Sequence, residues 1–571
     1  MPENELPEKT LRVRDWPSKS REAEDLMELS RREVVTLLGM SAASTFLGGT
    51  PSDAQASAAA PAPRMPLEEF VQNPQLLAAL RKGVRAMKAR KPSDPLSWFY
   101  QAAIHGVTDD AVKKAATQDP NVDAVFKKRY WNQCPHDGEN SANFLPWHRG
   151  YTYHFEKILR MHTEESRFSL PYWNYTDKKN RKFPREFGIK HLDGNLNNDA
   201  EENINPLYLA ERDFYFTGYE HPFATGLPLL ELSETAVDTT LSMSSPVFFG
   251  ETEREGLGGG IADEDPSTRG LLESYPHDQI HRAVGGIIDS STGQGTAGAM
   301  ATPPTAGFDP IFSIHHSNID RLWAEWSCIP GKKWGRLPSD YWFNERPWFF
   351  FDTDGKVISE PRKAYFDYRA LGVRFKYEDL SRKPLALPSL KPAGAEFFST
   401  GSKIQELLVE TSVSANILNV GRAVIPLSGT MKQHFATAIS TLDISPAGGN
   451  SRRLALRLQR VDLGLVQGTG FDLHLTSKPN GELARSDPSF IGSIALFRHL
   501  HDGNQHSPGG RSEMDETFDI SRALTSIGNS NLEDLSIVAI PYSLLTVPGR
   551  TTIPLNREFL SFGGLQLMAT L

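Results

Sequence analysis

The 571-residue sequence has few cysteines, no excess of positive charge and no long apolar run, and each shortage excludes a class of protein. Two cysteines, Cys134 and Cys328, allow at most one disulfide, which excludes a disulfide framework. A formal net charge of -9 and a pI near 6.0, without a clustered basic stripe, argue against nucleic acid as a partner. The length itself predicts two or more domains.

Residues 1–56 are expected to be an export signal rather than part of the fold. Arg31–Arg32 precede an apolar run, Val34–Leu47, which is too short to span a membrane as a mature helix. Ala54–Ala56 then fits an A-x-A cleavage pattern. This order of elements resembles a bacterial twin-arginine signal, the alternative being a disordered tail. We therefore predict a periplasmic or secreted mature protein without a membrane span.

The rest of the chain changes from helical to strand-like patterning. Residues 57–66 and 383–394 are rich in Pro or Ala and are interpreted as linkers. The segments with the clearest patterns are 76–91, 151–161 and 309–326 for helices, and 406–413, 454–461, 471–475, 491–497 and 535–541 for strands. We predict a mainly α domain over residues 67–382, a helical bundle with long loops, followed by a β-sandwich over residues 395–571.

Histidines are concentrated in the helical part, where eleven of the sixteen lie between His105 and His316. A single histidine is more often a surface or core residue than a metal ligand, so only the spacing of several histidines can indicate a metal site. His277 and His281 are four residues apart, which places both imidazoles on one face of a helix. Many helices carry such a pair by chance, and the pair alone is weak evidence.

A second pair of histidines follows a strong helix start. Asp309 can cap this helix and Pro310 suits its first turn. His315 and His316 then point about 100° apart, so one metal ion can readily take only one of them. Three further histidines lie upstream, His105, His136 and His148.

Several motifs recur in the order found in one protein family. FLPWHRGYTYHFEKIL (144–159), LPYWNY (170–175), PHDQIH (276–281) and DPIFSIHHSNIDRLWAEW (309–326) resemble the copper-binding regions of tyrosinases, catechol oxidases and hemocyanins. The resemblance covers roughly residues 67–377. DYWFN (340–344), FFFD (349–352) and, more loosely, residues 491–541 resemble later parts of plant polyphenol oxidases.

The resemblance implies two copper ions per chain, each held by three histidines. The implied ligands are His105, His136 and His148 for copper A, and His277, His281 and His316 for copper B. His315 is then a residue that supports a ligand or packs beside the site. A donor set of imidazoles alone suits copper, whereas di-iron sites favour Glu and Glu-x-x-His motifs. A dizinc hydrolase would usually have bridging carboxylates, and the ligand motifs contain none.

Three residues near the implied ligands have expected roles. Cys134 lies two residues before His136, a spacing that in fungal relatives accompanies a thioether bond to the imidazole. A free thiol and a disulfide to Cys328 are the alternatives. Glu273 matches a glutamate that holds a water near copper B in relatives, where it helps to deprotonate monophenols. Asp278 replaces the asparagine that assists it there.

The resemblance implies a polyphenol oxidase that converts o-diphenols to o-quinones and reduces dioxygen to water. Dioxygen and small phenols are then its partners, and monophenol hydroxylation is expected to be weak. An oxygen carrier like hemocyanin is the alternative from another class, and the export signal argues against it. Oxidation of o-aminophenols is a third possibility, which the ligands do not distinguish. The C-terminal domain is expected to shield the site, as in plant relatives.

Overall fold

The computed structural model describes most of the chain beyond residue 59. The described residues are 60–126, 130–135, 143–220, 229–250, 256–259, 269–288, 296–335, 343, 347–376, 405–411, 415–418, 422–441, 453–461, 469–495, 514–527, 532–546 and 559–570. All of them belong to one unit, Ala59–Leu571. The expected signal, His136 and the linker over residues 383–394 lie outside this part of the chain. Among the described helices, none is both long and apolar enough to cross a membrane.

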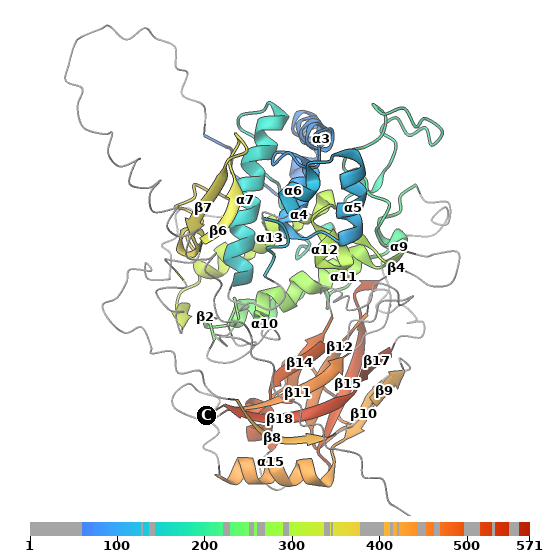
Figure 1. Ribbon diagram of the computed structural model, residues 1–571. Coiled ribbons are helices and arrows are strands. Elements are labelled where there is room, and N and C mark those ends of the chain that lie inside the picture. Colours follow the sequence, from blue (N-terminus) through green and yellow to red (C-terminus); the bar gives the residue numbers. More distant parts are fainter. Residues whose placement is uncertain are drawn as a thin grey trace, which may run out of the picture. The chain divides into compact units, whose positions relative to one another are not determined.

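Helices dominate the described residues as far as 376, as the sequence predicts. The α-helices are α2 (Leu67–Phe70), α3 (Pro74–Lys88), α4 (Trp98–His105), α5 (Asp109–Gln118), α6 (Val122–Phe126), α7 (Phe144–Thr163), α8 (Arg185–Gly188), α9 (Phe214–Thr217), α10 (Thr240–Ser244), α11 (Asp278–Gly285), α12 (Pro303–Ala306) and α13 (Pro310–Ser327). Shorter helical turns are Lys178–Asn180, Glu273–His277, Ala299–Ala301 and Arg362–Tyr365. Helices α4, α7, α11 and α13 form the centre of this helical region (Figure 1).

The same region contains only short strands among its described residues. They are β1 (Glu231–Leu232), β2 (Val247–Phe249), β3 (Ile287–Ile288), β4 (Thr296–Ala297), β5 (Lys333–Gly335), β6 (Pro347–Phe351) and β7 (Val357–Pro361). Pairs β2–β5, β3–β4 and β6–β7 each form a two-stranded sheet. These small sheets border the helices and do not form a common layer.

Local sequence explains where the two long central helices begin. The Asp309 carboxylate accepts the Ile311 N–H at 2.9 Å, and Pro310 occupies the first turn of α13, as predicted. Helix α7 begins at Phe144, seven residues before the expected 151, because Pro146 falls in the first turn, where its missing N–H costs nothing. This earlier start brings His148 into the helix.

Close packing holds α7 in place from the side of α3. The apolar residues Leu80, Val84 and Met87 recur at helical spacing along α3 and are buried. Gly83 allows the two helices to approach, since a Cβ atom there would lie 2.8 Å from Leu159 Cδ1. The helix that carries His148 therefore has little freedom to move sideways.

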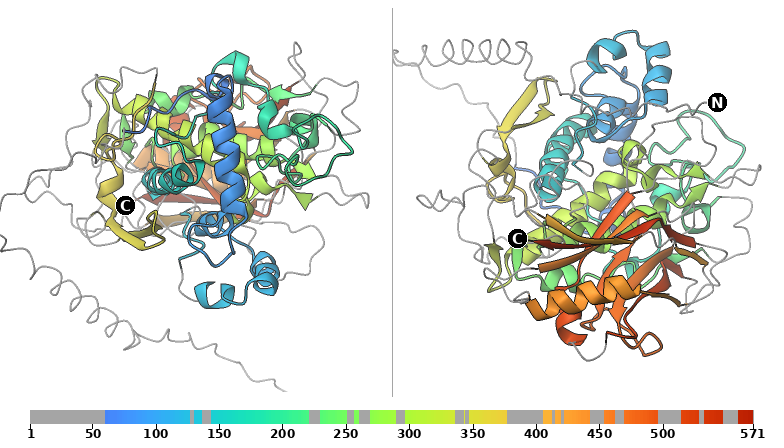
Figure 2. Two further views of the ribbon diagram at one scale, coloured as in Figure 1. Left: turned by 90° about the horizontal axis from the view of Figure 1, so that it is seen from above. Right: turned by 60° about the horizontal axis from the view of Figure 1, so that its bottom comes forward.

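Strands dominate the described residues from 405 onward. They are β8 (Gln405–Thr411), β9 (Ala415–Leu418), β10 (Ala423–Pro426), β11 (Arg453–Val461), β12 (Thr469–Thr476), β13 (Phe490–Ile494), β14 (Met514–Asp519), β15 (Ser536–Ser543), β16 (Leu545–Thr546), β17 (Phe559–Phe562) and β18 (Gly564–Thr570). Two antiparallel sheets, β10-β15-β12-β13 and β14-β11-β18-β8, share one apolar core. The predicted antiparallel β-sandwich is confirmed, and Figure 2 shows its strands in orange and red.

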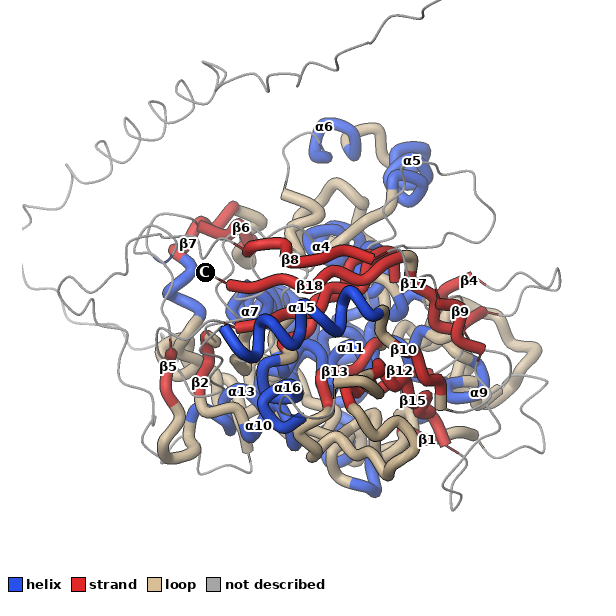
Figure 3. The backbone as a smooth tube through the Cα atoms, turned by 90° about the horizontal axis from the view of Figure 1, so that it is seen from below, coloured by secondary structure: helices blue, strands red, loops and turns tan. Residues whose placement is uncertain are grey.

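Two helices in this region were not predicted from the sequence. Helix α15 (Gly429–Thr441) buries Met431 and Phe435 in the sandwich core and lies against β8 (Figure 3). Helix α16 (Ser521–Ile527) buries Ala523 and Leu524 in the same core. Among the described side chains, each helix has only two fully buried apolar residues, too few for a clear helical period among so many strand signals.

Strand β16 extends the contacts of the sandwich into the helical region. Leu545 pairs with Leu232 of β1, and the Ser233 N–H donates to the Leu544 carbonyl at 2.9 Å. Leu544 and Leu545 are buried in the main core of the helical region. The strand-rich region therefore contributes side chains to the core that supports the helices.

The end of the first expected linker, residues 57–66, is folded. Arg64 is only 2% exposed, and its N–H donates to the Arg374 carbonyl at 2.7 Å. Its side chain pairs with Glu156 and Asp320 at 2.7 and 3.0 Å. The prediction of a linker as far as residue 66 is therefore wrong at this end. The Ala- and Pro-rich composition gave no sign that Arg64 would be needed as the partner of two buried carboxylates.

Candidate metal centre

The first group of candidate ligands lies between α4 and α7. His105 is the last residue of α4, and His148 lies in the second turn of α7. The Nδ1 atom of His105 bonds the Pro303 carbonyl at 2.9 Å, and that of His148 bonds the Phe144 carbonyl at 2.8 Å. Because a carbonyl only accepts, each Nδ1 carries the proton, and each Nε2 keeps a lone pair for a metal ion.

Cys134 completes this group among the described residues. A ligand atom of Cys134 lies within 4.8 Å of those of His105 and His148, and its Sγ is 3.5 Å from His148 Nε2. His136, the third predicted ligand, lies outside the described residues. The structure thus brings two of the three predicted copper-A ligands together, with the thiol beside them.

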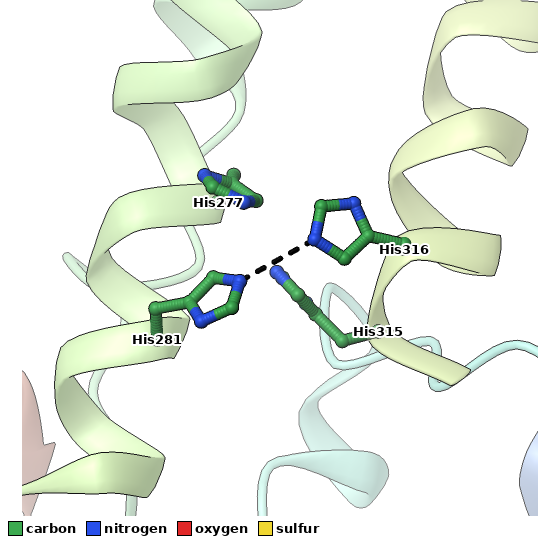
Figure 4. Close-up of side chains that lie close together, drawn as sticks. All are labelled: His277, His281, His315 and His316. Atoms are coloured by element: carbon green, nitrogen blue, oxygen red, sulfur yellow. Dashed lines mark hydrogen bonds between the residues drawn. The ribbon is translucent and has the colours of Figure 1, made fainter. Parts of the chain in front are cut away.

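The second group of candidate ligands lies between α11 and α13. His277, the residue before α11, and His281 of α11 project towards His315 and His316 of α13 (Figure 4). Ligand atoms of all four lie within 4.8 Å of one another, and all four side chains are buried. The predicted common face of His277 and His281 is confirmed, with ring centroids 4.4 Å apart.

Of the histidine pair, His316 occupies the position between the two groups. Its ring stacks on His148 with centroids 4.1 Å apart and a 6° angle, and its Nε2 lies 3.4 Å from His281 Nε2. His315 instead contacts His277 and His281, and its Nδ1 lies 3.3 Å from the Tyr175 hydroxyl. The helix thus brings both rings to the second group, but only His316 contacts both groups.

The donor set and its burial fit copper ions. Burial lowers the pKa of His148 and of His315 to about 3, and it lowers the pKa of His281 and of His316 well below the ordinary value. The imidazoles are therefore neutral, the form that binds metal ions. His281 Nδ1 donates to the Met300 carbonyl at 2.9 Å, so its Nε2 presents a lone pair towards His316. Neutral nitrogen donors facing one another suit a divalent or cuprous copper ion.

The two predicted catalytic carboxylates lie next to the second group. Asp278 accepts from His277 Nδ1 at 2.9 Å through Oδ1 and pairs with Arg269 through Oδ2. This carboxylate therefore orients a predicted copper ligand, an arrangement that commonly fixes the tautomer of a metal-bound histidine. Glu273 begins the π-helical turn that ends at His277 and is 2% exposed.

A buried ionic network, which the sequence did not reveal, ties the two ligand helices together. Asp320, on α13, accepts from Arg149 of α7 at 2.6 Å and from Arg64 at 3.0 Å. The Arg149 guanidinium also lies 3.4 Å from the centre of the Trp323 ring. Arg149 follows His148 and Asp320 lies four residues after His316, so the network sets the relative position of these two ligands. The only hint of this network in the sequence was that opposite charges, Arg149 and Asp320, lie near predicted ligands on two different helices.

Cys328 lies apart from the site. Both cysteines are buried, and neither forms a disulfide with the other. Cys328 Sγ lies 3.6 Å from an Arg369 nitrogen and 4.0 Å from the Tyr368 hydroxyl. The structure therefore contains no disulfide between Cys134 and Cys328, which removes one of the three alternatives for Cys134.

Comparisons with known proteins agree with this geometry. Residues 95–328 match the family described as the common central domain of tyrosinase. A tyrosinase from Hahella sp. (strain CCB-MM4) is 26% identical over 471 residues, which cover 78% of this chain and 88% of that protein. A chloroplastic polyphenol oxidase II from Ipomoea batatas is 23% identical over 440 residues, or 76% of this chain and 67% of the relative.

One solved structure extends the likeness to both regions of the fold. Latent apple tyrosinase superposes with a TM-score of 0.50 at 18% sequence identity. The match covers 90% of this chain and 98% of the apple chain. The helical region and the strand-rich region therefore occur together in that protein as well.

Proposed function

The chain belongs to the tyrosinase and polyphenol oxidase family of copper oxidoreductases, and we propose that it oxidises o-diphenols to o-quinones with dioxygen. It is a phenol oxidase with a dicopper centre. The observation that carries the proposal is the contact between two buried imidazole groups, made by His316 with His148 and His281. We propose His105, His136 and His148 as ligands of copper A, and His277, His281 and His316 as ligands of copper B. When bound, the copper pair supplies the electron transfer from the phenol to dioxygen.

The groups around the histidines act by orienting the imidazole rings. Backbone carbonyls and Asp278 fix the protonated Nδ1 of four histidines, so that each Nε2 is already oriented before a metal binds.

Turnover of catechol, tyrosine and o-aminophenol by copper-loaded protein, followed by quinone absorbance and oxygen uptake, tests the proposal. We expect catechol to be the best substrate, with one dioxygen consumed per two quinones. Reversible dioxygen uptake without quinone would indicate an oxygen carrier instead.

We further propose a thioether bond between Cys134 and His136 in the copper-loaded protein. The support is the Cys-x-His spacing and the buried Cys134 thiol beside His105 and His148. The bond joins sulfur to an imidazole carbon and removes two hydrogens, with dioxygen as the oxidant. Peptide mass spectrometry should show this loss of two hydrogens. In denaturant, Cys328 should be alkylated while Cys134 is not, and alkylation of both in active protein would exclude the bond.

We propose that the strand-rich region shields the site and makes the enzyme latent. The support is the contact of β13 and β16 with the helical region. The loop over Phe497–His506, the candidate for a blocking segment, lies outside the described residues. Cleavage in Lys383–Ala393 followed by removal of the region should raise diphenol turnover by about tenfold or more, since a minor open state is typically 0.1–10% populated. Unchanged activity after verified removal, measured with both copper sites filled, would contradict latency.

We propose export by the twin-arginine route, which suits a protein that acquires metal before transport. The support is the arginine pair, the short apolar run and the A-x-A pattern within residues 1–56. The exported protein should begin at Ser57. Replacing Arg31 and Arg32 together by lysine should keep the chain, still carrying the signal, inside the cell. An unprocessed or internally retained parent chain would contradict this route.

A further inference from the structure

The backbone just before His277 is contacted by the strand-rich region. Within the turn Glu273–His277, Tyr275 has a non-helical conformation, with φ -141° and ψ 106°. Its side chain is buried, and its hydroxyl accepts the Ser493 N–H of β13 at 2.6 Å. Tyr275 lies two residues before His277, a proposed copper ligand. Its hydroxyl is bound by Ser493, which is more than two hundred positions later in the chain.

Arg485 lies against the same tyrosine. Its guanidinium carbon is 5.4 Å from the Tyr275 ring centre and 4.7 Å from that of Tyr542. Asp472 of β12 holds the guanidinium through two contacts of 2.9 Å, from Nε to Oδ2 and from Nη2 to Oδ1. Such a two-point pair fixes the plane of the guanidinium. A cation fixed on an aromatic ring in turn restricts where that ring can lie.

The strand-rich region also acts on the following turn through a second contact. The Gln279 side-chain amide faces the carbonyls of Thr235 and Ala236, and it donates to them at 3.0 and 3.2 Å in the orientation that turns its nitrogen towards them. Arg485 Nη1 donates to the same Thr235 carbonyl at 3.4 Å, and Ser233, two residues earlier, bonds the Ser543 carbonyl. The start of α11 is therefore held on both sides of His277 by groups that the strand-rich region contacts.

We propose that Arg485, anchored by Asp472, is a positioning residue of the copper-B site. By holding Tyr275 it fixes the backbone that places His277, so the strand-rich region completes this metal site in addition to shielding it. The inference rests on the proposed function, because it takes His277 as a copper ligand. Removal of the strand-rich region should then have two opposite effects on activity. Substrates would reach the site more easily, but copper B would be bound less tightly.

The affinity of the copper-B site alone tests this role without relying on activity. In full-length chains that carry His105→Ala, which disables the copper-A site, copper affinity is measured by competition with a chelator. Adding Arg485→Met should weaken copper binding by about tenfold or more, the usual loss when a residue that orients a metal ligand is removed. Arg522→Met is the matched control, because Arg522 is an exposed arginine of the same region that donates to the Ser486 carbonyl at 3.4 Å. It should leave the affinity unchanged.

A second substitution covers the case in which Arg485→Met prevents folding, which circular dichroism would show. Tyr275→Phe keeps the ring under Arg485 but removes the hydroxyl that Ser493 binds, and it should weaken copper binding by a smaller factor. Equal affinity in the folded Arg485→Met and Arg522→Met chains would overturn the proposal. If only Tyr275→Phe folds, an unchanged affinity there would overturn it. A parent chain that fails to bind two copper ions would instead overturn the proposed function.

Discussion

His316→Ala is expected to bind one copper ion per chain in place of two and to lose diphenol oxidation, whereas His315→Ala keeps both ions. The two residues are adjacent, equally buried and on the same helix, so they form a matched pair. Removing residues that only orient a ligand costs about 10–100-fold in metal affinity, and removing the ligand itself should cost more. The reason for expecting His316 is its contact with both histidine groups. Metal analysis after dialysis measures the result.

The structure makes this comparison a demanding one, since His315 also reaches the second group. A ligand atom of His315 lies within 4.8 Å of those of His277 and His281, as does that of His316. His315, however, has the Tyr175 hydroxyl as a partner for its Nδ1. If His316→Ala kept two copper ions and His315→Ala lost one, then His315, and not His316, would be the copper ligand. Circular dichroism of both variants controls for misfolding.

Glu273→Gln is expected to depress monophenol turnover by about 100-fold or more while diphenol turnover changes little. A phenol with a pKa of about 10 is mostly protonated at neutral pH, so hydroxylation needs a base, and general base catalysis contributes about 10²–10⁴-fold. We propose that the buried Glu273 carboxylate, at the start of the turn that ends at His277, accepts that proton through a water molecule. Glutamine has the same shape and cannot accept the proton.

Comparison with Asp278→Asn distinguishes proton transfer by Glu273 from support of the copper-B ligand His277. The Asp278 carboxylate bonds both His277 and Arg269, so its loss should affect monophenol and diphenol oxidation alike. Parallel rates on tyrosine-like and catechol-like substrates, with copper content measured for each chain, distinguish the two carboxylates. If Glu273→Gln reduces both rates equally, Glu273 only supports the helix and the proton-transfer role has to be abandoned.

Some features of the site were readable from short stretches of sequence. Asp309 and Pro310 marked the start of α13, and the four-residue spacing of His277 and His281 placed them on one face. Each of these depends on interactions within a few residues, which local sequence specifies. The family resemblance of the motifs, confirmed by the match over residues 95–328, then supplied the metal and the reaction class.

Other features depended on residues far apart in the chain. No spacing rule predicts that His148 and His316 stack, that Arg64 pairs with Asp320, or that Arg485 reaches Tyr275. Asp278 contacts both His277 and Arg269, a pairing that its position in the motif did not predict. Such pairings form only when helices and sheets pack, because burial of charge demands a partner from whichever element lies nearest.

The sequence by itself determined the fold class, the order of the two regions and the residue types that can bind copper. Periodicity and capping are local properties, and the ligand motifs are continuous stretches of chain. The tertiary structure decided which histidine of the pair contacts both groups and which carboxylate orients His277. It also decided how the strand-rich region contacts the metal site through Tyr275. These depend on close packing between distant segments, in which a shift of about one ångström changes the partner of a side chain.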